Sequence, residues 1–201
     1  GGAKVSSKLS VIVNMLNVVD NLIIGGGMAY TFIKNNGGSI GDSIFEKDCL
    51  NDCTKIIEQA RNKGVNIYLP TDVIASNEFS DTSLKKEINI YQIPEGWQGL
   101  DIGTKTRREF EKVIFSSKTI LWNGPMGVFE MSSFEHGTKE VAIAVGKATT
   151  QGAFSLVGGG DSVAAIKKFK LEQSISCIST GGGAMLESLE GKVLPGIKAL
   201  I

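Results

Sequence analysis

Three runs of three consecutive glycines are the residues whose type and spacing most directly suggest chemistry in this sequence. They are Gly25–Gly27, Gly158–Gly160 and Gly181–Gly183, and each follows a short apolar run and precedes a stretch with helical spacing. Glycine allows a positive φ angle and lets a ligand come close to the backbone, and the first turn of the following helix presents unpaired N–H groups. Because such groups attract anions, the triplets predict a phosphate-binding site.

The number and the position of these triplets favour ligand binding over simple packing. Glycine also permits close contact between strands and helices, and packing explains any single triplet equally well. The chain has 25 glycines in 201 residues. At that frequency chance would give only about 0.3 triplets in a chain of this length. Three triplets in the same context therefore indicate a shared role.

Two common nucleotide-binding motifs are absent from the sequence. None of the triplets completes G-x-G-x-x-G, because the sixth positions are Tyr30, Val163 and Leu186, and no G-x-x-x-x-G-K-[ST] loop occurs. The sequence therefore argues against a dinucleotide-binding oxidoreductase domain and against a P-loop protein.

Charged side chains lie next to the glycines. Lys4 and Lys8 follow an initial Gly-Gly pair and are four residues apart. A helix beginning here would place both ammonium groups on one face, which suits two neighbouring phosphates, although a solvated lysine pair is the alternative. Asp161 and Ser162 directly follow the second triplet. A carboxylate at this point can hold Mg²⁺ against phosphate oxygens, or it can simply cap the helix.

The segment Leu121–Glu130 combines the groups that a base and a ribose need. It contains apolar side chains, an amide and a carboxylate directly after a strand-like run. An apolar wall can take the face of an adenine, and Glu130 could accept hydrogen bonds from ribose hydroxyls. The alternative is a tight turn around a structural Trp122. The segments Leu69–Asp72 and Gly99–Gly103 are weaker examples of the same kind of strand-end loop.

The elements that must position these residues alternate between strand and helix. Strand-like apolar runs occur at Asn21–Ile24, Val65–Leu69, Thr119–Trp122, Ala153–Val157 and Ile175–Ile178. Helical spacing occurs at Val5–Val19, Met28–Lys34, Asp48–Lys63, Lys105–Ser116, Ser133–Thr150, Ser162–Lys168 and Ala184–Leu189. This order predicts a doubly wound α/β domain, a Rossmann-like three-layer αβα arrangement with a mostly parallel sheet. Ligands of such domains bind at the carboxyl ends of the strands.

One stretch lacks this alternation. Ile74–Glu95 is polar without sustained periodicity, which predicts a long surface excursion with an antiparallel hairpin near Glu87–Ile93. No linker divides the chain, so residues 1–201 are expected to form one domain.

Composition limits the possible partners. Lys plus Arg and Asp plus Glu are balanced at 21 each, so no net charge favours nucleic acid or an anionic membrane. No apolar run approaches the ~20 residues that span a bilayer. Three cysteines without a leader indicate a reducing compartment, and we expect a cytoplasmic protein. Cys49 and Cys53 have no second pair beside them and His136 is isolated, which argues against zinc and against a nucleophilic triad.

Taken in order, the motifs resemble phosphoglycerate kinase across nearly the whole chain. The matching segments are GGAKVSSK, IIGGGMAYTF, LPTDV, GLDIG, WNGPMGVFE, VGGGDS and STGGGAMLESLEGKVLPG. The resemblance implies the C-terminal lobe of a two-lobe enzyme, which binds Mg-ADP or Mg-ATP, whereas a separate N-terminal lobe holds 3-phosphoglycerate or its acyl phosphate. The implied activity is reversible phosphoryl transfer in glycolysis by a monomer.

Carried over by position, the resemblance gives each motif a role. Lys4 would lie against the transferring phosphate and Lys8 against the inner phosphates, while Asp161 would hold Mg²⁺ with Ser162 near the phosphates. Asn123 would contact phosphate or ribose, and Glu130 would bind the ribose. The other residues implied to line the nucleotide site are Gly2, Ala3, Gly25, Gly26, Gly99, Leu100, Pro125, Val128, Gly159 and Gly160. Gly181, Gly182 and Gly183 would present the helix N-terminus that stabilises the phosphoryl group in transfer.

The sequence also departs from the family pattern. Ser7 stands where Asp or a small residue is usual, Thr104 replaces a usual Pro and Ser162 a common Thr, and we expect all three to be tolerated. The family's strand leading into Gly1 and its N-terminal lobe with the catalytic arginines lie outside this sequence. We therefore expect nucleotide binding without turnover, and a non-catalytic nucleotide-binding or interaction module remains the alternative. Replacing Lys168 is expected to have no effect on binding.

Overall fold

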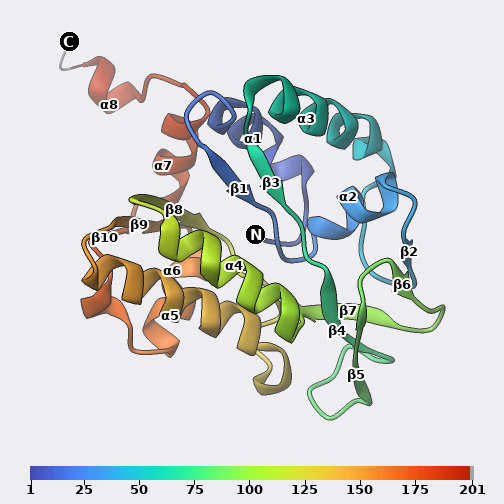
Figure 1. Cartoon of the computed structure of the whole chain (residues 1–201). Helices are drawn as coiled ribbons and strands as arrows, with labels where there is room; N and C mark the ends of the chain where they lie inside the picture. The colour runs from blue at the N-terminus through green and yellow to red at the C-terminus, as the bar shows by residue number, and fades with distance from the viewer. Residues whose placement is uncertain (200–201) are drawn as a thin grey trace.

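Five short parallel strands position the glycine-rich loops, which follow the carboxyl ends of four of them (Figure 1). Strand β1 (Asn21–Ile23) pairs with β3 (Asn66–Tyr68), and β8 (Thr119–Asn123), β9 (Phe154–Gly158) and β10 (Cys177–Ser179) form a second sheet in the order β10-β9-β8. All five predicted strands are therefore present, with shifted ends. They form two separate parallel sheets.

The computed structural model describes residues 1–199, and its helices follow the predicted spacing. The helices and 3₁₀ turns are η1 (Ser6–Lys8), α1 (Leu9–Met15), α2 (Ala29–Asn35), η2 (Lys47–Cys49), α3 (Leu50–Lys63), α4 (Thr104–Ser116), η3 (Ser132–Phe134), α5 (His136–Thr150), α6 (Gly160–Lys168), η4 (Glu172–Ser174), α7 (Gly182–Leu189) and α8 (Pro195–Lys198). Helices α2, α4, α6 and α7 come directly after a strand in chain order, as in other α/β domains.

The side chains of β1 and β3 alternate between two apolar clusters. Leu22 and Ile67 pack with residues of α1, α2 and α3, whereas Ile23 and Tyr68 pack with residues of α4 and α5. Strands that bury both faces between helices define a three-layer αβα domain. The predicted fold class is thus confirmed, and the same layers are visible around β1 and β3 in Figure 1.

The prediction of a surface excursion at Ile74–Glu95 is wrong for most of that segment. Strand β4 (Asp72–Ser76) pairs antiparallel with both β5 (Lys85–Asn89) and β7 (Gln98–Ile102), and β2 (Ser39–Ile40) pairs with β6 (Gln92–Ile93). Residues of β4 and β6 join an apolar cluster with α2. Alternate residues of β5 remain exposed, which explains why the segment looks polar in the sequence.

A second correction concerns Gly99–Gly103, which was expected to be a strand-end loop. Gly99 and Leu100 lie in β7 and are buried. A Cβ at Gly99 would overlap the hydroxyl of Tyr30, so the glycine here serves the close packing of α2 against the strand.

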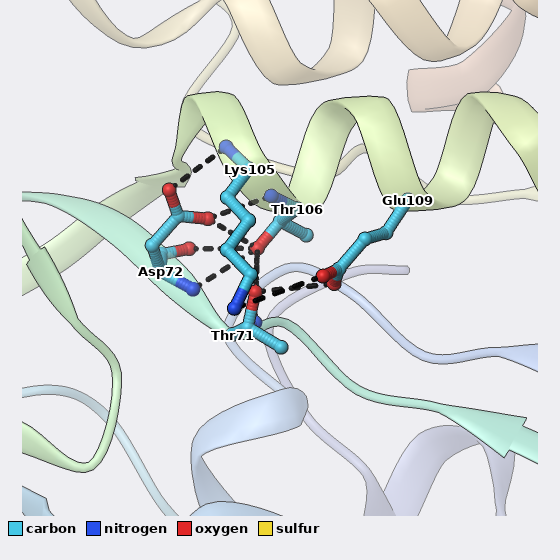
Figure 2. Close-up of polar contacts among 5 residues, drawn as sticks. All are labelled: Thr71, Asp72, Lys105, Thr106 and Glu109. Atoms are coloured by element: carbon cyan, nitrogen blue, oxygen red, sulfur yellow. Dashed lines mark hydrogen bonds and ion pairs between the residues drawn. The ribbon is translucent and has the colours of Figure 1, made fainter.

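The loop Leu69–Asp72 also differs from its expected role, because its polar residues anchor α4 (Figure 2). Asp72 accepts the backbone N–H groups of Lys105 (2.9 Å) and Thr106 (2.7 Å). The Thr106 hydroxyl in turn accepts the backbone N–H of Thr71 (2.9 Å), whose own hydroxyl donates to Glu109 (3.1 Å). These residues therefore cap a helix.

Asp101 attaches α5 to β7 in a similar way. Its side chain is 2% exposed and accepts the backbone N–H groups of Gly137 (2.7 Å) and Ile102 (2.9 Å). Burial raises the pKa of Asp101 to about 7, although both hydrogen bonds and the charge of Arg107 oppose this shift. The folded protein consequently binds a proton that the unfolded chain, with a carboxyl pKa near 3.9, has lost at neutral pH.

We predict that Asp101 makes the folded state less stable as the pH rises. Because the pKa of Asp101 is raised in the folded state, the free energy of unfolding falls between about pH 4 and 7. The decrease between pH 5 and 8 amounts to about 2–3 kcal/mol. Urea unfolding of the wild type and of Asp101→Asn at both pH values measures this difference. An equal pH dependence in the two proteins would contradict the prediction.

Candidate functional site

The first glycine triplet and the loop after β8 meet at Gly2. The backbone N–H of Gly2 donates to the carbonyl of Pro125 (3.1 Å), and its carbonyl accepts the N–H of Met28 (2.9 Å). Gly26 has a φ of +69°, and a Cβ there would lie 2.7 Å from the Gly2 nitrogen and 2.8 Å from the Pro125 carbonyl oxygen. Only glycine permits this approach.

The second and third triplets meet beside Asn123. The amide nitrogen of Asn123 donates to the carbonyl of Gly158 (2.7 Å). A Cβ on Gly182 would lie 2.9 Å from the Cα of Gly159, so α6 and α7 begin next to each other. Asn123 Oδ1 is buried and has no hydrogen-bond partner in residues 1–199. A buried acceptor of this kind is usually paired, which marks a place where a ligand could donate.

Lys8 connects these two groups of glycines. Its ammonium group donates to the carbonyls of Gly1 (2.5 Å) and Asn123 (3.2 Å). Burial lowers the pKa of Lys8 to about 8, and the nearby charge of Asp161 opposes part of this shift. A half-buried cation is therefore placed between the starts of the glycine-opened helices.

The expectation that Lys4 and Lys8 share one helix face is wrong. Lys4 precedes the 3₁₀ turn η1, and Lys8 has a φ of −130° at the junction between η1 and α1. Lys4 is exposed, whereas Lys8 turns inward. The spacing of four has no helical meaning here, because the first turn is not an α-helix.

Helix N-termini in this protein differ in what accepts their N–H groups. Four carboxylates from other elements accept N–H groups at the starts of η1, α4, η3 and α5, namely Glu46 to Ser6, Asp72 to Lys105 and Thr106, Asp81 to Ser132 and Ser133, and Asp101 to Gly137. By contrast, within the part of the chain described, the first N–H groups of α6 and α7 donate to no side chain and to no backbone carbonyl, whereas those of α2 are taken by the carbonyls of Gly26 and Gly27. The helices after the second and third triplets thus keep donors available for an anion.

The loop after β8 is held by several elements. Gly124 N–H donates to Ser162 Oγ (2.5 Å), Met126 N–H to Thr138 Oγ1 (3.0 Å) and Val128 N–H to the carbonyl of Leu100 (2.9 Å). Trp122, 5% exposed, donates from its indole to the Gly124 carbonyl (2.8 Å). The structural interpretation of Trp122 is therefore correct, and it is compatible with a binding role for the rest of the loop.

Several predicted site residues support the loop from beneath. Ser162 is fully buried and its hydroxyl bonds to Gly124, and Leu100 is buried below Val128. Both residues therefore support the loop, and their direct contacts with a nucleotide stay predictions. Asp161 is exposed in the first turn of α6 and makes no cap bond, which leaves its carboxylate available for a cation.

The remaining predicted residues differ in their exposure to solvent. Gly25 is buried; Gly160, Glu130, Ala3, Gly181 and Gly183 are exposed. One residue was missed by the sequence analysis. Ile44 is 52% exposed and lies over Gly27, which is close to the carbonyl of Ala3. The loop that carries Ile44 has no periodicity or motif in the sequence, so Ile44 can be recognised as a candidate site residue only from its exposure in the folded chain.

Two observations concern potential metal ligands and thiols. Among residues 1–199, no three His, Cys, Asp or Glu side chains are grouped so that they could hold a metal ion. Cys49 and Cys53 are buried in the apolar core.

No helix within residues 1–199 is long and apolar enough to cross a membrane.

Comparison with known proteins gives a consistent result. The family model for phosphoglycerate kinase matches residues 1–192. The chain is 52% identical over 200 residues to the phosphoglycerate kinase of Porphyromonas gingivalis, and covers 48% of that protein. It superposes on solved phosphoglycerate kinase structures from Coxiella burnetii (TM-score 0.96, 45% identity) and Pyrococcus horikoshii OT3 (TM-score 0.82, 32% identity), covering 100% of this chain and 51% and 50% of those chains. The chain spans about half the length of the curated relative it matches.

We predict that Ser162→Ala lowers the free energy of unfolding by about 1–3 kcal/mol, because the buried Gly124 N–H loses its acceptor. Urea unfolding measures the change. Ser188→Ala is the matched control, since Ser188 is exposed on α7, and it should change stability by less than about 0.5 kcal/mol. Equal effects of the two changes would rule out this role for the Ser162 hydroxyl.

Proposed function

The chain belongs to the phosphoglycerate kinase family, and we propose that it binds Mg-ADP or Mg-ATP as the nucleotide half of that enzyme. The proposed whole-protein reaction is the reversible transfer of a phosphoryl group between 1,3-bisphosphoglycerate and ADP, which gives 3-phosphoglycerate and ATP in glycolysis. The other half, an N-terminal lobe carrying 3-phosphoglycerate, is the proposed partner. The protein is expected to act as a cytoplasmic monomer.

The observation that carries this proposal is the position of Lys8 near the starts of α6 and α7, whose first N–H groups have no acceptor within residues 1–199. Each free helix N-terminus is equivalent to about half a positive charge. The Lys8 ammonium lies between Gly1 and Asn123, and Asn123 approaches the starts of α6 and α7. A polyphosphate placed here would exchange part of its hydration for fixed donors and one cation.

The residues present also fit Mg²⁺ bound together with a nucleotide. Mg²⁺ commonly uses one or two protein carboxylates and completes its shell with phosphate oxygens and water. Asp161 supplies such a carboxylate beside the second triplet, and the unpartnered Asn123 Oδ1 is a neutral oxygen nearby. When bound, Mg²⁺ would neutralise charge on the phosphate oxygens.

Base and ribose would occupy the other end of the site. The Ile44 side chain lies over Gly27, and Pro125 and Val128 are partly exposed in the loop after β8; apolar side chains of this kind suit an adenine ring. Glu130 is exposed at the end of the loop, where its carboxylate could accept hydrogen bonds from ribose hydroxyls.

Phosphoryl transfer itself depends mainly on positioning and on neutralising charge. We assign Lys4 and the start of α7 at Gly181, Gly182 and Gly183 to the phosphoryl group in transfer. The acceptor or donor of that group would come from the N-terminal lobe. The chain alone should therefore bind nucleotide without turnover, whereas a non-catalytic binding module would show no turnover even with that lobe supplied.

The first test is calorimetric titration of the chain with ADP at fixed Mg²⁺. Loss of a charged hydrogen bond costs about 1.5–3 kcal/mol, so Lys8→Ala should weaken ADP binding roughly 10- to 150-fold. Lys4→Ala should weaken ATP by a similar factor and ADP less, because Lys4 is assigned to the phosphoryl group in transfer. Asp161→Ala should weaken ADP binding in Mg²⁺ and have less effect in EDTA. Lys112→Ala, on the exposed face of α4, is the control; equal weakening by this change would show that the site is misplaced.

The lowered pKa of Lys8 gives a second prediction. With a pKa of about 8, Lys8 loses its charge as the pH rises from 7 to 9, and about a tenth remains protonated at pH 9. Because phosphate binding requires the ammonium form, ADP affinity should fall by about tenfold over this range. Lys8→Arg keeps its charge, so its affinity should change little. A flat profile in the wild type would contradict the prediction.

A further inference from the structure

Lys168, at the C-terminal end of α6, contacts the loop that carries Glu130. Its ammonium group donates to the carbonyl of Phe129 (2.6 Å) and forms an ion pair with Glu135 (2.6 Å). The Lys168 and Glu135 side chains are 38% and 17% exposed. The structure therefore does not support the expectation that Lys168 can be replaced without effect.

The two ends of α6 hold the two ends of the same loop. Ser162, in the first turn of α6, accepts the N–H of Gly124, and Lys168, in its last turn, donates to the carbonyl of Phe129. These helix positions are six residues, or about 9 Å, apart along the axis. A rigid helix thus fixes both the start of the loop and the residue directly before Glu130.

The Glu130 carboxylate has no contact of its own that fixes its position. Glu130 is exposed, and its carboxylate takes part in no hydrogen bond or ion pair within residues 1–199. Its position therefore depends on the loop backbone, which is held by the buried Phe129 ring, by the N–H groups of Phe129 and Met131 on the carbonyls of Gly127 and Val128, and by Lys168 on the Phe129 carbonyl. Without Lys168, the Phe129 carbonyl loses a charge-assisted hydrogen bond, which is stronger than a neutral one.

We propose that Lys168 is a positioning residue for nucleotide binding. It holds Glu130 in place for the ribose, so that α6 joins the phosphate end of the site, at Asp161 and Ser162, to the ribose end. This inference rests on the proposed nucleotide function and adds a residue to it that touches neither base nor phosphate.

A purely structural role for Lys168 makes a different prediction. If the Lys168–Glu135 pair only stabilised the contact of α6 with the start of α5, its loss would weaken every ligand of the site alike. A positioning role instead weakens only those ligands that have a ribose. Mg-tripolyphosphate presents a Mg²⁺-bound phosphate chain, one phosphate longer than that of Mg-ADP, and lacks both base and ribose, so the two ligands separate a role at the phosphates from a role at the nucleoside end, which Glu130→Ala then assigns to the ribose contact.

The experiment titrates Mg-ADP and Mg-tripolyphosphate into the wild type, Lys168→Met, Lys168→Arg and the control Lys112→Met. Methionine keeps the apolar stem and removes the donor. We expect Lys168→Met to weaken ADP about tenfold, the value of one such bond, and tripolyphosphate less than twofold. Lys168→Arg should recover most of the ADP affinity, because guanidinium also donates to a carbonyl and a carboxylate.

A double-mutant cycle with Glu130→Ala completes the test. If Lys168 acts through Glu130, adding Lys168→Met to Glu130→Ala should weaken ADP by less than a further twofold. Full additivity, or equal weakening of both ligands, would overturn the inference.

Circular dichroism checks the fold of each variant, and Lys168→Gln takes the place of Lys168→Met if the latter does not fold. A wild type that does not bind ADP would overturn the proposed function as well, whereas ADP binding that is insensitive to Lys168→Met would overturn this inference alone.

Discussion

The close approach of three backbone segments at Gly2 is the constraint on which the rest of the site depends. Gly2 bonds to Pro125 and to Met28, and Gly26 leaves no room for a side chain between them. This contact brings the carboxyl ends of β1 and β8 together although their two sheets are not hydrogen bonded to each other. It also places the Gly1 and Asn123 carbonyls within reach of Lys8.

Carboxylates accept N–H groups at the starts of some helices and not of others. Asp72, Asp101, Asp81 and Glu46 reach across from other elements and accept N–H groups at helix starts, so those helices are anchored to the antiparallel sheet and its neighbouring loops. Helices α6 and α7, which follow the second and third glycine triplets, have no acceptor for their first N–H groups in the described residues. The same electrostatic preference of helix N-termini for negative charge thus stabilises the fold at one set of helices and leaves the other set for a ligand.

Local patterns predicted the parallel part of the fold well. The apolar runs, Thr119–Trp122 among them, form strands at or near their predicted positions, and the period of α3 follows from its single apolar side. The same reasoning failed for β4, β5 and β7, since a half-exposed antiparallel strand with a polar turn resembles a loop in sequence. It also failed for Lys4 and Lys8, because spacing indicates a common face only within a regular helix, and the chain there begins as a 3₁₀ turn.

The sequence by itself determined the fold class, the glycine-opened helix starts and the family, because periodicity, glycine placement and motif order are local properties of the chain. Only the tertiary structure decided which polar groups face a ligand and which hold the scaffold. Ser162 and Leu100 became supports, Ile44 became an exposed apolar wall, and Lys168 became a contact of the ribose loop. These roles depend on contacts between residues far apart in the chain, since burial and hydrogen-bond partners are fixed only when β8, α6 and the glycine loops pack together.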